Sequence, residues 1–138
     1  MFGAPSRYAA PSARYRDIDV AARVQGATPH GLIQIMFEEL LKGLDTLAAA
    51  EAVHDFARRN AAQARAISLL HGLESSLDYT RGGEIADNLG RIYREARRLL
   101  GPTPGMDRGT ATAQARDMLS TISGAWAAIG PMVNDNVT

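Results

Sequence analysis

The chain has 138 residues, no cysteine and a balanced charge, with 15 Lys and Arg against 15 Asp and Glu. Disulfides and cysteine-ligated zinc are therefore excluded, and the basic excess that is typical of nucleic-acid binding is missing. Frequent alanine and the lack of any alternating apolar segment predict an all-α domain, which at this length can bury a core without a metal.

Residues 1–28 are predicted to form an irregular N-terminal arm, because Pro5 and Pro11 interrupt it. A short helix is expected within the arm at about 16–25. The arm has no apolar run of the length that a signal peptide or a membrane span requires. We therefore expect a soluble protein without membrane insertion.

The first long helix is predicted over about 29–53, with Thr28 as the capping hydroxyl and Pro29 at the first helical position. Its apolar residues recur every three or four positions and share one face: Ile33, Phe37, Leu40, Leu44 and Leu47. Three neighbours widen this stripe: Leu32, Met36 and Leu41. Such a stripe is usually core, but the extra width leaves room for a second contact surface.

Three further amphipathic helices are predicted, at about 55–78, 84–100 and 107–132. Their apolar stripes include Phe56, Ile85, Leu89 and Ile129. The predicted connections are 79–83 and the GPTPG stretch at 101–105, and residues 134–138 are expected to form a loose tail. Four such helices joined by short turns favour an antiparallel up-down-up-down four-helix bundle over residues 29–133.

Three patterns could carry chemistry, and each lacks a required part. The Gly82-Gly83 pair has neither the preceding strand nor the GxxxxGK[ST] pattern of a phosphate loop, so it is interpreted as a turn. Only one Glu-x-x-His pair, Glu51 and His54, is present, whereas a di-iron bundle needs two. A third set shares one helix face but has no oxyanion donors: His71, Ser75 and Asp78. We expect no metal, no cofactor and no enzymatic activity.

Arginines project from one side of the third long helix, at positions 91, 94 and 98. They form either a solvated face paired with acids such as Glu95 or a docking patch for an acidic partner. No aromatic residues accompany them as a stacking platform, which argues against nucleic acid as the partner.

Three stretches carry a family resemblance. They are VQGATPHGLIQIMFEELL from Val24, the motif residues of SLDYTRGGEIADNLGRIY from Ser76, and MLSTISGAWAAI from Met118. In this order and at this spacing they resemble the FliS family of flagellar export chaperones, and Tyr15 stands where that family has an N-terminal tyrosine. The chain departs from the pattern at Phe37-Glu38-Glu39, where the family has Tyr-Asp-Gly, and at the GPTPG loop.

The resemblance implies a cytoplasmic chaperone. The family binds the disordered C-terminal segment of flagellin, prevents its premature polymerisation and brings it to the export gate, the cytoplasmic domain of FlhA. The resemblance also implies an arm, around Tyr15 and Ile18, that covers the groove until flagellin displaces it. Deleting residues 1–17 should then raise client affinity or promote self-association, and a homodimer is allowed without client. The alternative is a divergent helical adaptor or a self-assembling interaction protein.

The expected flagellin-binding residues come mainly from the first long helix: Ile33, Met36, Phe37, Leu40, Leu41 and Leu44. Others come from the arm and the later helices: Tyr15, Ile18, Leu89, Tyr93 and Trp126. Simple core packing is the competing interpretation for each of them. Met36 and Leu41 lie off the main stripe and therefore discriminate best between the two interpretations.

Overall fold

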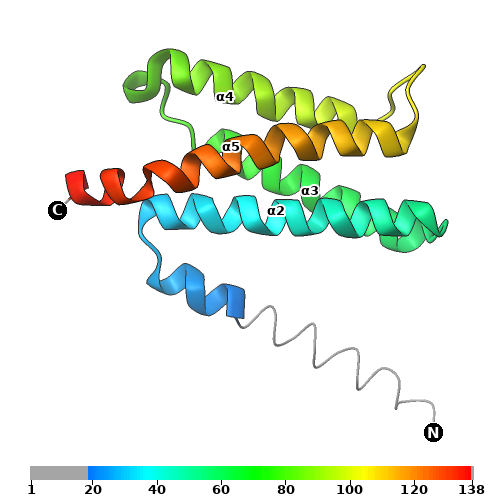
Figure 1. Ribbon diagram of the computed structural model, residues 1–138, viewed down its shortest axis with the longest axis horizontal. Helices are drawn as coiled ribbons and strands as arrows, with labels where there is room; N and C mark the ends of the chain where they lie inside the picture. Colours follow the sequence, from blue (N-terminus) through cyan, green and yellow to red (C-terminus); the bar gives the residue numbers. More distant parts are fainter. Residues whose placement is uncertain (1–18, 138) are drawn as a thin grey trace, which may run out of the picture.

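The computed structural model describes the backbone of residues 19–137 and the side chains of residues 19–129. The long helices are α2 (Pro29–Ala52), α3 (Phe56–Ser75), α4 (Tyr79–Leu100) and α5 (Arg108–Val137) (Figure 1). Residues 19–26 are also helical and precede α2. No strand occurs within the described residues, and the predicted all-α class is confirmed.

Each long helix begins after a residue whose side-chain oxygen accepts a hydrogen bond from the backbone N–H three positions later. These capping residues are Thr28, Asp55, Asp78 and Asp107, with donor–acceptor distances of 3.0, 3.2, 3.1 and 3.0 Å. Such a cap is worth about 1 kcal/mol, because it satisfies a backbone donor that the helix itself cannot pair. Pro29 follows Thr28 and lacks such a donor.

The start of α4 differs from the prediction. The connection was expected over 79–83, but Asp78 caps a helical turn that begins at Tyr79. The chain then bends at Gly83, whose φ of 52° and ψ of −124° lie in a region that only glycine adopts readily. The glycine pair thus provides a kink inside α4, and the connection from α3 is the short segment 76–78.

The C-terminal end also differs from the prediction. The backbone of α5 stays helical to Val137, beyond the expected end near 132, and the loose tail predicted over 134–138 is helical in its described part. No glycine or proline follows Pro131 to stop the helix. None of the helices in residues 19–137 combines the length and the apolar character that crossing a bilayer requires.

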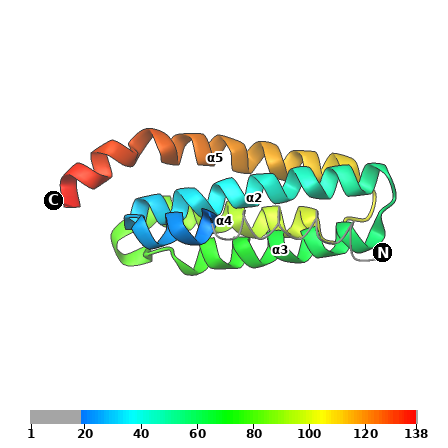
Figure 2. The same cartoon turned by 90° about the horizontal axis from the view of Figure 1, so that it is seen from below.

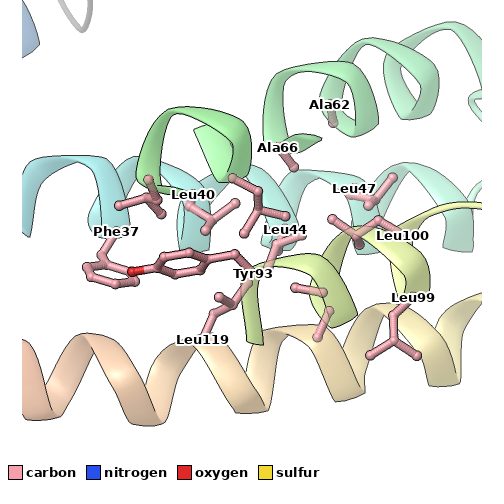
Figure 3. Packing of buried hydrophobic residues seen from close by; sticks show 14 of the residues in the cluster. Phe37, Leu40, Leu44, Leu47, Ala62, Ala66, Tyr93, Leu99, Leu100 and Leu119 are labelled. Atoms are coloured by element: carbon pink, nitrogen blue, oxygen red, sulfur yellow. The ribbon is translucent and has the colours of Figure 1, made fainter. Parts of the chain in front are cut away.

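The four long helices pack in a closed arrangement, in which α2 and α4 each contact both α3 and α5 (Figure 1 and Figure 2). We call the end where α2 and α4 begin the head and the opposite end, where α3 and α5 begin, the base (Figure 1). The core between the helices is built mainly from leucine and alanine, with Phe37 and Tyr93 as its aromatic members (Figure 3).

Candidate partner-binding surfaces

Four of the expected flagellin-binding residues are members of the core. Phe37, Leu40 and Leu44 are 0% exposed and Tyr93 is 2% exposed. Figure 3 shows them pointing into the space between the helices, where the rings of Phe37 and Tyr93 lie 6.3 Å apart. They form the centre of their helical stripes, which faces the other helices. In this conformation they present almost no surface to a partner, and their contact with flagellin stays a prediction.

Five other expected residues are half-buried and pack against the edge of the core: Ile33, Met36, Leu41, Leu89 and Trp126. Met36 reaches across to α3, where a Cβ added to Gly72 would come within 2.8 Å of its terminal methyl carbon. These side chains therefore combine packing with some accessible apolar surface. The two remaining expected residues, Tyr15 and Ile18, lie outside the described residues.

Trp126 and His30 join α5 to the first turn of α2 at the head. Their rings stack with centroids 4.6 Å apart and an angle of 5° between the planes. The indole Nε1 of Trp126 donates to the His30 carbonyl at 3.0 Å, and Nε2 of His30 donates to the Trp126 carbonyl at 2.7 Å. Since His30 is only 8% exposed, these bonds satisfy a buried polar group. Trp126 thus has a structural role that its sequence position did not reveal.

The most exposed large apolar side chains lie elsewhere than expected. Five of them are near the head: Val24, Leu32, Tyr79, Ile85 and Ile129. Two are at the base: Val53 and Phe56. The sequence placed Phe56, Ile85 and Ile129 on core stripes, yet they are 67%, 71% and 41% exposed. Their spacing matches the core, but they lie near the head or the base, where the neighbouring helices leave them uncovered.

The arginine face of α4 is largely paired with acids. Glu74 accepts hydrogen bonds from Arg97 and Arg94, and Glu95 accepts two from Arg98. The hydrogen bond from Arg97, supported by Arg94, lowers the pKa of Glu74 below its ordinary value. These pairs favour a solvated structural face over a docking patch.

The candidate chemical groups do not converge. Glu51 accepts a hydrogen bond from the Thr112 hydroxyl at 3.2 Å, and Asp78 is used as the cap of α4. Within the described residues, no three metal-ligating side chains come together. What the side chains offer instead is apolar contact area, concentrated at the head and the base.

The buried hydroxyl of Tyr93 should make the free energy of unfolding depend on pH in the alkaline range. Burial raises the pKa of its hydroxyl to about 12, whereas an exposed tyrosine titrates near pH 10. Between these values the unfolded chain has lost the proton and the folded chain keeps it, so the free energy of unfolding falls as pH rises. The loss should reach about 2–3 kcal/mol.

Denaturant titrations of the wild type and Tyr93→Phe, from about pH 9 to about pH 12, check this expectation. The free energy of unfolding of Tyr93→Phe should not show the fall that ionisation of Tyr93 causes in the wild type. A parallel decline of both proteins would show that another group is responsible.

The fold and these surfaces define a helical protein whose accessible apolar side chains suit the binding of another polypeptide. The family model described as "Flagellar protein FliS" matches residues 11–133. The chain therefore belongs to the FliS family.

Two relatives agree with this membership. The "Flagellar secretion chaperone FliS" of Salmonella typhimurium (strain LT2) is 30% identical over 118 residues, which cover 85% of this chain and 87% of the relative. The "Flagellar secretion chaperone FliSB" of Pseudomonas aeruginosa (strain PAO1) is 34% identical over 80 residues, which cover 58% of this chain and 64% of that relative.

Proposed function

We propose that this protein is a flagellar secretion chaperone that binds the disordered C-terminal segment of flagellin, prevents its premature polymerisation and assists its export. The observation that carries the proposal is membership of the FliS family over nearly the whole chain, with relatives that are named as flagellar secretion chaperones. The client segment would fold into helices as it binds, so that its apolar stripe is shielded from other flagellin copies.

The scaffold for this activity is an antiparallel up-down-up-down four-helix bundle. Two features support this topology: the closed set of contacts among α2, α3, α4 and α5, and the alternation of helix starts between head and base (Figure 1). Core residues such as Leu40 and Leu44 keep the helices together, and this leaves the half-buried and exposed apolar residues available to a client. A preformed scaffold loses little conformational entropy on binding, which favours affinity.

The client site is proposed to lie toward the head. Five of the exposed large apolar side chains lie there, and the half-buried Ile33 and Met36 of α2 and Trp126 of α5 are near them in the fold. Burying one such side chain contributes about 1.5–3 kcal/mol, so a few of them suffice for specific binding.

The arm and the remaining partners complete the proposal. The helix at 19–26, which belongs to the N-terminal arm, is joined to α2 by an ion pair between Arg23 and Glu38. We propose that this arm, including Tyr15 and Ile18, covers the client site until flagellin displaces it and allows a homodimer in its absence. The loaded chaperone would deliver flagellin in the cytoplasm to the cytoplasmic domain of FlhA.

Ile85→Glu tests the client site without disturbing the core, because Ile85 is 71% exposed. A glutamate there should lower the affinity for a flagellin C-terminal peptide at least about tenfold, since a charge would have to be buried against the client. Isothermal titration calorimetry measures the affinity, and circular dichroism checks that the helices remain.

The matched control is Val53→Glu, which changes a side chain of nearly the same exposure, 70%, at the base. It should bind flagellin like the wild type. Equal weakening by both substitutions would contradict a client site at the head, and an absence of binding to any flagellin peptide by the wild type would favour an adaptor with another client.

A further inference from the structure

The base contains a hollow of about 700 Å³ that the proposed chaperone function does not use. The end of α2, the turn into α3 and the first residues of α5 surround it. Its apolar wall includes Ala48, Ala52 and Phe56, and its polar rim includes Glu51, Arg59 and Arg108. We call this hollow the base pocket. Its volume lies within the range of ligand sites, and it brings together residues that are far apart in the sequence.

The acids around the base pocket already have partners. Asp107 accepts hydrogen bonds from the backbone N–H and the hydroxyl of Thr110, and Asp55 caps α3. Glu51 accepts a hydrogen bond from the hydroxyl of Thr112. Part of the acceptor capacity of these carboxylates is therefore used in starting the helices and joining α2 to α5.

The guanidinium groups of Arg59 and Arg108 have hydrogen-bond donors that are not paired with protein acceptors in the described part of the chain. The Nε of Arg59 is buried without a partner, and its guanidinium makes one hydrogen bond, to the side chain of Asn60 at 2.9 Å. Arg108 is exposed, and among the described residues its guanidinium makes no ion pair and no hydrogen bond to another residue. Because the Nε of Arg59 is covered by protein atoms, a ligand oxygen would meet the terminal nitrogens of the guanidinium, which make a single hydrogen bond within the described residues.

The position of these arginines is also unfavourable for the helices themselves. Arg108 is the first residue of α5, and Arg59 lies near the start of α3. The positive end of the helix dipole disfavours a cation in the first turn. A charge that costs stability and makes no ion pair is a local inconsistency of the kind that marks functional sites.

Apolar surface flanks the arginines. Phe56 lines the base pocket and is 67% exposed, and Val53, which lies between the lining residues Ala52 and His54 in the sequence, is 70% exposed. His54 between them has a φ of 57°, which is unusual for a residue with a side chain, and its ring centroid lies 6.1 Å from that of Phe56. The wall is thus open, whereas a small-molecule site encloses most of its ligand. This openness favours a side chain presented by another polypeptide.

We propose that the base pocket binds a short peptide segment of a partner protein, in which a carboxylate lies next to a large apolar side chain. The carboxylate would accept hydrogen bonds from Arg59 and Arg108, and the apolar side chain would pack against Phe56 and Val53. Arginine suits this role because its planar donors match a carboxylate. The site is at the opposite end of the molecule from Trp126, so it is independent of the proposed client site.

A peptide of stated composition tests the proposal on the full chain: acetyl-Leu-Asp-Phe-Glu-Leu-amide, followed by two-dimensional NMR. We expect shifts at the amides of residues 54–59 and 107–109 and at the Nε–H of Arg59. The matched peptide with Asn and Gln in place of Asp and Glu should bind at least about tenfold more weakly, because it loses the charge-assisted hydrogen bonds.

Arg59→Gln and Arg108→Gln should each weaken the acidic peptide about tenfold. Arg108→Gln should keep or raise stability, since it removes a cation from a helix start. Arg91→Gln on α4 is the control and should bind the peptide like the wild type.

Three results would overturn the proposal. They are shifts confined to the head, equal binding of the neutral peptide, and binding of 3-phenylpropionate as tight as that of the peptide. The last result would indicate a small-molecule site. The outcome does not depend on flagellin, so it can be separated from the outcome of the chaperone test.

Discussion

Phe37→Ala is expected to lower the free energy of unfolding by about 3–5 kcal/mol. Phe37 is 0% exposed and packs against Tyr93 at the centre of the core, so its removal leaves a cavity between α2 and α4. The surrounding helices are held by other contacts and can close the cavity only in part. Denaturant titration followed by circular dichroism measures the loss.

Leu41→Ala is the matched comparison, because Leu41 is on the same helix but only half-buried. It should cost about 1–2 kcal/mol, because less apolar area is lost from the core than at Phe37. For Phe37→Ala, the fraction that remains folded should bind flagellin nearly as well as the wild type. If Phe37→Ala kept wild-type stability and lost flagellin binding, the assignment of Phe37 to the core would be wrong.

The helix starts could be predicted from sequence because they depend on local chemistry. Thr28 was predicted as a cap and accepts the expected hydrogen bond, and Asp55 and Asp107 accept the same kind of bond at the starts of α3 and α5. Asp78 does the same, but the two glycines that follow it looked like a turn. A glycine can end a helix or kink it, and the choice depends on whether the tertiary fold holds the residues before it in place.

The binding surfaces were harder to predict because exposure depends on where a helix ends relative to its neighbours. Ile85 and Phe56 have the same spacing as core residues, yet both are more than two-thirds exposed. Conversely, Phe37 and Tyr93 looked like contact candidates and are core. The base pocket is formed by residues from 48–59 and 107–109, so no local sequence motif could predict it.

Trp126 is the residue in which packing and binding are hardest to separate. The resemblance that led to the family suggested a client contact, and its half-buried ring allows one. Its stacking on His30 and the two reciprocal hydrogen bonds favour a clamp that joins α5 to the start of α2. Aromatic stacking contributes about 0.5–1.5 kcal/mol beyond area burial, and each hydrogen bond contributes about 1 kcal/mol.

Trp126→Ala should therefore lower the free energy of unfolding by about 3 kcal/mol, and Trp126→Phe, which keeps a stacking ring but loses the indole N–H, by about 1 kcal/mol. Denaturant titration followed by circular dichroism compares the three proteins, and calorimetry with a flagellin peptide is done under conditions where all are folded. For a clamp, the phenylalanine variant binds flagellin like the wild type, since its ring still orders the first turn of α2. If both variants keep wild-type stability while flagellin binding is lost in each, Trp126 is a client contact and the clamp is excluded.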